Sequence, residues 1–240
     1  MLLAKIKTLV PRSVKSAVKA ALGAYRFERA LHSLLRLPAG ETPPVALIEQ
    51  LAVAWGNEGF AAKDAYLLEI CSRAARTSGP ILECGSGLST ILLGVLAGRR
   101  GVSVWSLEHI PEWATRSQNI LNRHRLHNVC LCLTPLRDYG EFTWYNPPPG
   151  LPQRFSLVVC DGPPLSVRGH RYGLLPVLGE RLTEGGVILM DDTALTEEQE
   201  VMQRWVQEFH VSVEMRYLLG RSFAILTCPT IPRAGTQTPE

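Results

Sequence analysis

The segment Ile81-Leu82-Glu83-Cys84-Gly85-Ser86-Gly87-Leu88-Ser89-Thr90 decides the fold of this chain of 240 residues. It begins with a short apolar run typical of a buried strand, continues into two glycines, and leads directly into a helical pattern. Gly85 and Gly87 let the backbone turn sharply and let a ligand approach without meeting Cβ atoms. The start of the following helix offers unpaired N–H groups to an anion. The segment therefore predicts a binding loop for a charged, nucleotide-like ligand.

Short apolar runs alternate with helical patterns beyond this segment. The expected strands are 81–83, 102–107, 129–133, 156–160 and 186–190, and helices are expected to begin near Leu88, Pro111, Arg171 and Glu197. Such alternation is typical of a buried, mostly parallel sheet. Two final strand candidates, 211–217 and 222–228, are joined so tightly that they must be antiparallel neighbours. The expected fold class is α/β: a doubly wound, mostly parallel seven-stranded sheet closed by an antiparallel hairpin, with an N-terminal helical extension.

An acidic residue, Glu108, follows the second expected strand. It stands about twenty residues beyond the glycine loop, where a carboxylate accepts hydrogen bonds from ribose hydroxyls in nucleotide-binding sheets. The dinucleotide fingerprint, however, requires a third glycine where this chain has Thr90. The ordinary NAD-binding pattern is therefore broken, while a ribose-bearing ligand is still expected.

The run Glu83-Cys84-Gly85-Ser86-Gly87 resembles the acidic-x-Gly-x-Gly motif of class I S-adenosylmethionine (SAM)-dependent methyltransferases, whose fold is Rossmann-like. The parallel sheet of this family also closes with an antiparallel strand, as expected for this chain. The resemblance covers residues 61–228. It implies that SAM is the cofactor and that Glu108 holds the ribose of SAM. By the same resemblance, the cofactor-binding residues are Glu83, Gly85, Ser86, Gly87, Ser89, Glu108 and Asp161.

Aspartates end the fourth and fifth expected strands: Asp161 follows 156–160, and Asp191 and Asp192 follow 186–190. Ligands of open α/β sheets bind beyond the C-terminal ends of the strands. The pattern resembles metal-dependent catechol-type O-methyltransferases, in which an acid after strand four and an Asp-Asn pair after strand five bind a divalent cation. Asp192 stands where that family has Asn. The resemblance implies that the three aspartates bind a hard cation such as Mg²⁺; the alternative is that they cap helices or fix turns.

A further resemblance concerns Asp161-Gly162-Pro163. Bacterial and plant methyltransferase-like proteins with Asp-Gly-Pro after strand four often have a Trp-Tyr pair before that strand and an arginine after it, here Trp144-Tyr145 and Arg168 or Arg171. Some plant relatives methylate sugar acids in polysaccharides. This resemblance implies that Asp161 and Arg171 are catalytic residues.

The residues around these arginines leave two interpretations open. Arg168, His170 and Arg171 either face an anionic acceptor or form a solvated loop. Tyr172 and the segment 138–153 are expected to form the acceptor pocket or its lid, because so long a polar connection is atypical.

Charge separates the N-terminus from the rest of the chain. Residues 1–36 carry eight Lys and Arg and one Glu, a net charge of +7, which leaves −4 for the remainder of a chain whose total is +3. We expect a basic helical arm and linker at 1–44, interrupted at Pro11 and Gly23, a SAM-binding domain at 45–228 and a disordered tail at 229–240. The arm either contacts anionic lipid or an acidic partner, or is a solvated helix.

The composition and the hydropathy pattern indicate where in the cell the protein is located and which class of partner it does not bind. No apolar run approaches the roughly 18 residues that span a bilayer, and the N-terminus lacks the apolar core of a signal peptide. We therefore expect a cytoplasmic protein, with peripheral membrane contact through residues 1–36. The slightly acidic domain argues against a nucleic-acid partner.

The expected function is transfer of a methyl group from SAM to an oxygen of a small-molecule or carbohydrate acceptor. Since the cofactor arrives preactivated, orientation and desolvation supply most of the acceleration. One alternative is a catalytically inactive SAM-fold protein that acts as a membrane-associated or scaffolding partner. The other is an NAD-dependent oxidoreductase.

Overall fold

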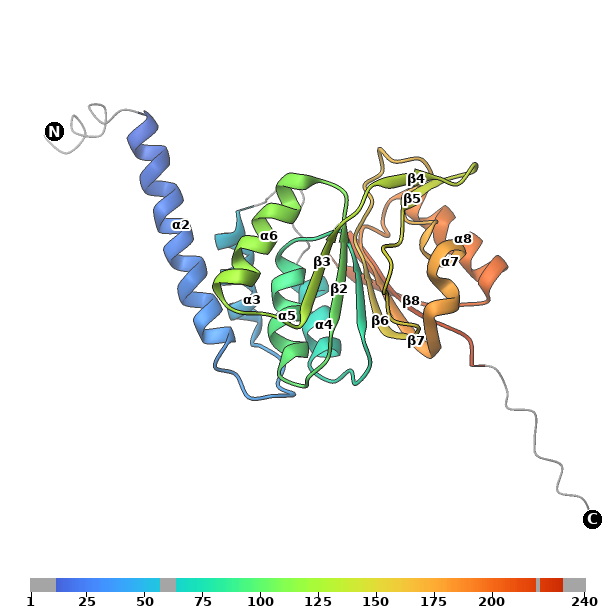
Figure 1. Cartoon of the computed structure of the whole chain (residues 1–240), viewed down its shortest axis with the longest axis horizontal. Coiled ribbons are helices and arrows are strands. Elements are labelled where there is room, and N and C mark those ends of the chain that lie inside the picture. The colour runs from blue at the N-terminus through green and yellow to red at the C-terminus, as the bar shows by residue number, and fades with distance from the viewer. Residues whose placement is uncertain (1–11, 57–63, 219–220, 231–240) are drawn as a thin grey trace, which may run out of the picture.

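A computed structural model describes residues 12–56, 64–218 and 221–230 (Figure 1). Its helices are α2 (Arg12–Leu34), α3 (Val45–Trp55), α4 (Asp64–Ala74), α5 (Leu88–Gly98), α6 (Pro111–Arg123), α7 (Leu174–Leu178) and α8 (Thr196–Phe209). Its strands are β1 (Ile81–Cys84), β2 (Val104–Glu108), β3 (Val129–Leu133), β4 (Leu136–Asp138), β5 (Thr143–Tyr145), β6 (Phe155–Cys160), β7 (Leu182–Met190), β8 (Ser212–Leu218) and β9 (Arg221–Thr227). A 3₁₀ turn, Gly179–Arg181, follows α7.

Seven of the described strands form one sheet, in the order β3-β2-β1-β6-β7-β9-β8. The first five strands in this order are parallel neighbours, whereas β9 is antiparallel to both β7 and β8. The last strand of the chain is thus inserted between β7 and β8, which leaves β8 at the edge. The predicted fold class is confirmed, including the antiparallel hairpin that closes the sheet.

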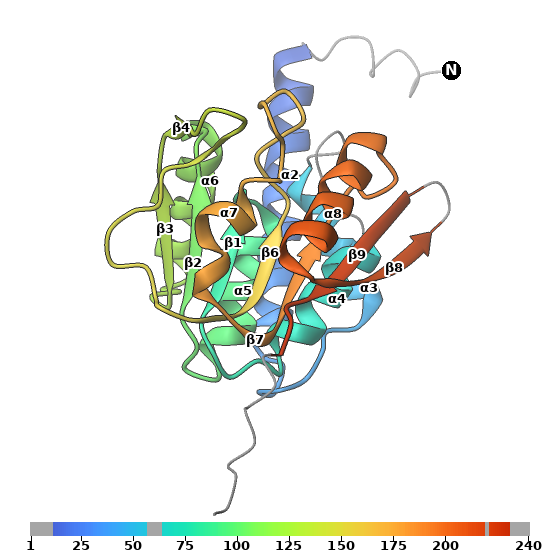
Figure 2. The ribbon, with the colours of Figure 1, turned by 90° about the vertical axis from the view of Figure 1, so that its right-hand side faces the viewer.

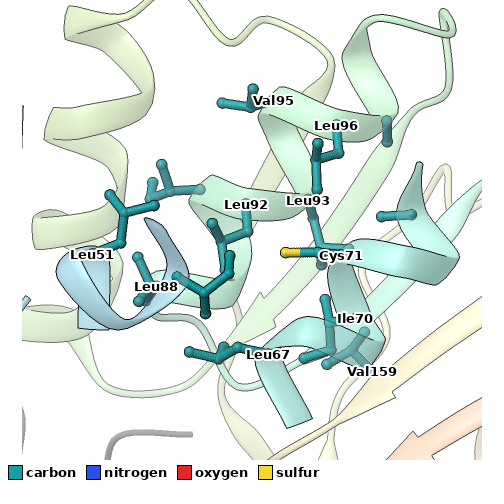
Figure 3. Close-up of a cluster of buried hydrophobic side chains, with 14 of the residues drawn as sticks. Leu51, Leu67, Ile70, Cys71, Leu88, Leu92, Leu93, Val95, Leu96 and Val159 are labelled. Carbon is teal, nitrogen blue, oxygen red and sulfur yellow. The ribbon is translucent and has the colours of Figure 1, made fainter. Parts of the chain in front are cut away.

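Each face of the sheet has its own hydrophobic core. Ile81 of β1 contributes to the core under α2 to α6, and its neighbour Leu82 contributes to the core under α7 and α8, because successive side chains of a strand point to opposite faces. Figure 1 shows the two groups of helices on either side of the sheet. Part of the first core is drawn in Figure 3, where side chains of α4 and α5 meet Leu51 of α3 and Val159 of β6.

Helix α2 runs without interruption through Gly23, so the predicted break at this residue is wrong. A Cβ at Gly23 would meet nothing within 4 Å, and a glycine inside a helix costs only about 1 kcal/mol relative to alanine. The second half of α2 offsets this cost by burying Phe27, Leu31 and Leu34 in the core that it shares with α3. The break predicted at Pro11 lies outside the described residues.

A small hairpin in which β4 pairs with β5 was not expected from the sequence. Its second strand and its turn lie in the segment 138–153 that is predicted to form the acceptor pocket or its lid. Its Trp144 is buried, and a Cβ at Gly173 would lie 2.6 Å from the Cβ of Trp144. The N–H of Thr143 donates to the carbonyl oxygen of Arg168 at 2.8 Å. The hairpin is therefore packed tightly against the loop that precedes α7.

Pro229 and Thr230 of the predicted tail have no regular structure, and residues 231–240 lie outside the described part. The boundary between arm and domain at residue 44 stays a prediction. None of the described helices is long and apolar enough to cross a membrane.

Candidate active site

The register of the parallel strands aligns four strand ends at one edge of the sheet. Cys84 of β1 lies opposite Leu107 of β2 and Cys160 of β6, and Cys160 lies opposite Met190 of β7. The residues that follow these positions are Gly85, Glu108, Asp161 and Asp191. Predicted site residues from distant parts of the sequence thus meet at the C-terminal edge of the sheet.

The two glycines of the loop between β1 and α5 meet different requirements. Gly85 has a φ of +91°, a conformation that favours glycine, and a Cβ there would lie 3.2 Å from the amide nitrogen of Gly162. Gly87 has a φ of −178°, which any residue adopts, and a Cβ there would meet nothing within 4 Å. Gly87 lines a cavity. Its missing side chain therefore leaves room for a ligand and is not needed for backbone geometry.

Glu83 lies beneath this loop and does not line the cavity. Its buried Oε2 accepts hydrogen bonds from the hydroxyls of Thr90 (2.7 Å) and Ser106 (2.5 Å). The Thr90 hydroxyl in turn accepts the N–H of Gly87 at 2.9 Å. Burial raises the pKa of Glu83 to about 7. Glu83 therefore positions the loop through Thr90, a residue whose part in the site the sequence did not indicate.

Glu108 presents its carboxylate at the cavity in a fixed orientation. Its Oε2 accepts the N–H and the hydroxyl of Ser86 (2.8 and 2.9 Å), and its Oε1 accepts the N–H groups of His109 (2.7 Å) and Ile110 (2.8 Å). Burial acts to raise the pKa of Glu108, but hydrogen bonds from the His109 side chain, from the N–H of Ile110 and from Ser86 outweigh burial, and the pKa lies below its ordinary value. Glu108 is therefore an ionised acceptor, which strengthens a hydrogen bond that it receives from a hydroxyl group.

The cavity brings together six of the predicted cofactor-binding residues: Gly85, Ser86, Gly87, Ser89, Glu108 and Asp161. Three aromatic residues also line it, namely Trp55 of α3, Trp113 of α6 and Tyr145 of β5. Tyr145 belongs to the segment 138–153 that is predicted to form the acceptor pocket or its lid, whereas no role was predicted for Trp55 or Trp113. Trp113, on the helix directly after Glu108, could have been noticed. Flat apolar rings beside a carboxylate suit a ligand that joins an aromatic base to a sugar.

The three predicted metal ligands converge, but an arginine is bound among them. One oxygen from each of Asp161, Asp191 and Asp192 lies within 4.8 Å of the others. Nη2 of Arg171 donates to Oδ1 of Asp161 (3.2 Å), to the carbonyl oxygen of Asp161 (3.1 Å) and to Oδ2 of Asp192 (3.3 Å). A guanidinium thus already compensates part of the negative charge of this cluster, and a divalent cation is not needed for that compensation. The geometry does not support the predicted cation site.

Arg171 also connects this cluster to α8. Its Nη1 donates to Oε1 of Glu198 at 2.5 Å, and both side chains are buried. Burial acts to lower the pKa of Arg171, but Glu198 and Asp161 outweigh it and raise the pKa, so the guanidinium stays charged. Burial and the nearby Asp191 raise the pKa of Asp161 well above its ordinary range. The sequence did not indicate Glu198, because an acid in the first turn of a helix is ordinarily an exposed partner of the helix dipole.

The other candidates for acceptor contacts, Arg168, His170 and Tyr172, do not line this cavity. Arg168 is exposed and pairs with Asp138 at 2.5 Å. The hydroxyl of Tyr172 donates to Glu208 of α8. Arg168 and Tyr172 thus join neighbouring elements of the protein and do not reach the predicted site.

No protein-family model and no curated protein matches the chain, but solved structures match its fold. The SAH-bound methyltransferase PaMTH1 of Podospora anserina matches with a TM-score of 0.56 at 13% identity, over 90% of this chain and 97% of that one. A SAM-dependent O-methyltransferase of Thermotoga maritima matches with a TM-score of 0.54 at 15% identity, over 80% and 74% of the two chains. The fold is that of class I SAM-dependent methyltransferases.

A third structure adds an oxygen-methylating example of this methyltransferase fold. The O-methyltransferase of Bacillus cereus in complex with SAH matches with a TM-score of 0.50 at 17% identity, over 77% of this chain and 90% of that one. Identities this low describe a shared methyltransferase fold. The chemistry of the site therefore rests on the residues of this chain.

Proposed function

We propose that this chain is a SAM-dependent methyltransferase that acts on an oxygen of a small-molecule or sugar-type acceptor. The proposal rests on one observation: at the cavity, a glycine without a side chain lies near a carboxylate that hydrogen bonds hold in place. Gly87 leaves the cavity free where a side chain would project, and Glu108 is held at the cavity as an ionised hydrogen-bond acceptor. A ligand that fits both has an anionic end for the start of α5 and a hydroxyl-bearing sugar for Glu108. SAM has both groups.

The cofactor-binding roles follow from these positions. Gly85 and Gly87 keep the loop open, and Ser86 and Ser89 lie where the loop meets α5. The methionine carboxylate of SAM would bind at the start of α5, and its ribose hydroxyls would donate to Glu108. Trp113 would pack against the adenine ring. Glu83 would contribute indirectly, since it holds the loop through Thr90.

Asp161 and Arg171 would act on the acceptor. When bound, SAM supplies a methyl group on a positively charged sulfur, which makes that methyl electrophilic. Asp161 lies in the cavity wall, and its raised pKa makes it a stronger base than an ordinary carboxylate. Arg171 orients Asp161 through a hydrogen bond. Its positive charge acts to lower the pKa of Asp161, which favours the ionised form of this carboxyl. The methyl–oxygen bond would form as the methyl–sulfur bond breaks, and the hydroxyl proton of the acceptor would pass to Asp161.

Transfer to oxygen is supported by two structural neighbours that are O-methyltransferases by name and by the carboxylate in the cavity wall. The proposal routes no step through a metal ion, because the guanidinium of Arg171 compensates the aspartates that a cation would need. A small-molecule or carbohydrate hydroxyl is the acceptor that we propose.

Isothermal titration of the purified chain with SAM, SAH and NAD tests the cofactor. We expect SAM and SAH to bind and NAD not to bind. Gly87→Leu should weaken SAH binding at least tenfold with unchanged thermal unfolding, and Gly87→Ala should weaken it less, because the larger side chain fills more of the cavity. Preferential binding of NAD would contradict the proposal.

Methyl transfer from labelled SAM to a panel of phenols, sugars and sugar acids tests the reaction. Asp161→Asn should lower the rate by two orders of magnitude or more while SAH still binds, as loss of a general base does. Tight SAH binding without product from any acceptor would favour the inactive SAM-fold alternative.

A further inference from the structure

The N-terminal half of α2 extends beyond the rest of the domain in two perpendicular views (Figures 1 and 2). Between Val14 and Arg26, the described side chains are exposed. They include four large apolar side chains, here called the apolar stripe: Val14 (47% exposed), Val18 (52%), Leu22 (50%) and Tyr25 (65%). Large apolar side chains that gather on one exposed surface mark an interaction site.

The apolar stripe lies opposite the face by which α2 packs on the domain. Its members are spaced by four, four and three residues, which keeps them on one side of a helix with 3.6 residues per turn. The same geometry places the buried residues of α2 about 180° away. Those buried residues are Phe27, Ala30, Leu31 and Leu34. The stripe therefore points away from the protein, and the packing of α2 leaves it uncovered.

Exposed positive side chains lie to one side of the apolar stripe, where α2 faces the grooves that it forms with α3 and α6. Lys19 and Arg26 are exposed, and no carboxylate among the described residues pairs with either of them. By sequence, the first 36 residues carry a net charge of +7, against −4 for the rest of the chain. An outward apolar stripe with cationic side chains to one side complements a surface that is apolar inside and negatively charged outside.

We propose that α2 binds the surface of an anionic phospholipid bilayer. The apolar stripe would enter the boundary between headgroups and acyl chains, and Lys19 and Arg26 would contact lipid phosphates. The competing occupant is the α2 helix of a second copy of this chain. Pairing of two such helices would bring their cations together, so charge favours the lipid surface. This proposal does not depend on the proposed methyl transfer.

Co-sedimentation of the full chain with vesicles tests the proposal. The vesicles contain phosphatidylcholine alone or phosphatidylcholine with about 30% phosphatidylserine, an anionic lipid. We expect the chain to partition at least tenfold more strongly onto the anionic vesicles and to be released by high salt. The variant Lys19→Gln/Arg26→Gln should bind roughly 25-fold more weakly, at about fivefold per charge.

A second variant separates the apolar stripe from the charges. Val18→Gln/Leu22→Gln/Tyr25→Gln keeps good helix formers in α2 and should weaken binding at least tenfold. The matched control is Val206→Gln on α8, an apolar residue of similar exposure (41%) outside α2, which should bind as the wild type does. Equal binding to both kinds of vesicle would overturn the proposal. The proposal would also be overturned if the chain bound no vesicle and formed a dimer in light scattering, and if the stripe variant dissociated this dimer.

Discussion

Glu83 keeps a carboxylate inside the protein with only one of its oxygens bonded. Oε2 receives two hydroxyl groups, whereas Oε1 has no hydrogen-bond partner among the described residues. The ionised form therefore lacks the full set of donors that water gives it in the unfolded chain. This explains why burial dominates and the pKa of Glu83 rises to about 7.

The raised pKa of Glu83 predicts a loss of stability as the pH rises. The folded state binds the proton more tightly than the unfolded state, so the stabilisation is complete below pH 4.5 and is lost as the pH rises to about 7. Relative to Glu83→Gln, the wild type should lose about 3 kcal/mol of unfolding free energy between pH 4.5 and pH 8. Urea unfolding at both pH values measures this difference. Glu214→Gln, on an exposed side chain, is the control; an identical pH dependence of wild type and Glu83→Gln would refute the prediction.

Gly162 offers a second test on a single residue. A Cβ there would lie 2.7 Å from the hydroxyl oxygen of the buried Tyr145 and 3.2 Å from the Cα of Gly85. Gly162→Ala should therefore lower the free energy of unfolding by about 1–3 kcal/mol, the usual cost of overpacking. Gly87→Ala, whose Cβ faces open space, should change it by less than about 0.5 kcal/mol. Chemical denaturation compares the two; equal effects would mean that the two loops do not pack as described.

Between elements, the buried ion pair of Arg171 and Glu198 joins the loop before α7 to the first turn of α8. The same guanidinium contacts Asp161 after β6 and Asp192 after β7. Three segments of the C-terminal edge thus share one positive charge. Removing a single partner of such a group leaves buried charge uncompensated, whereas removing both partners can be almost neutral.

Arg171→Met should therefore lower the free energy of unfolding by about 3–5 kcal/mol, as loss of one partner of a buried ion pair does. The double variant Arg171→Met/Glu198→Leu should recover part of this loss. Arg168→Met removes a pair with Asp138 that is more than half exposed, and should cost less than about 1 kcal/mol. Urea denaturation of the three variants tests the prediction, which fails if the two arginine substitutions cost the same.

The contacts of Arg171 with the aspartates also predict that a chelator has no effect on stability or activity. Because Arg171 compensates Asp161 and Asp192, EDTA should change neither the melting temperature nor the rate of methyl transfer. Thermal unfolding and the labelled-SAM assay, each with EDTA and with added Mg²⁺, measure the effect. A tenfold stimulation by Mg²⁺ would restore the divalent-cation interpretation.

For the whole molecule, local pattern was enough to predict the sheet and the glycine-containing loop between β1 and α5. Apolar runs after Gly79, the glycines at 85 and 87 and the short link between the last strands are all readable within a few residues. Contacts across long distances in sequence were not readable. Arg171 and Glu198 are 27 positions apart, and Trp55 reaches the cavity from a helix that precedes the whole sheet. Charge and burial at such positions depend on packing, which the pattern of one segment does not contain.

The division of the chain into arm and domain can be tested along α2 itself. Leu31 has no exposed surface, whereas Leu22 is half exposed on the same helix. Leu31→Ala should lower the free energy of unfolding by about 2–5 kcal/mol, and Leu22→Ala should change it by less than about 0.5 kcal/mol. Similar effects of the two substitutions on urea unfolding would mean that α2 is either wholly part of the core or wholly outside it.

Trp55 touches both the cavity and the arm. Its ring lies 5.6 Å from that of Phe27 in α2 (centre to centre), and the same residue lines the cavity. A small molecule that immobilises the indole should slow amide hydrogen exchange in the α2 backbone around Phe27. If the small molecule also raises the affinity of α2 for a bilayer, bilayer binding should raise the affinity for the small molecule by the same factor, because coupling between two binding events is reciprocal.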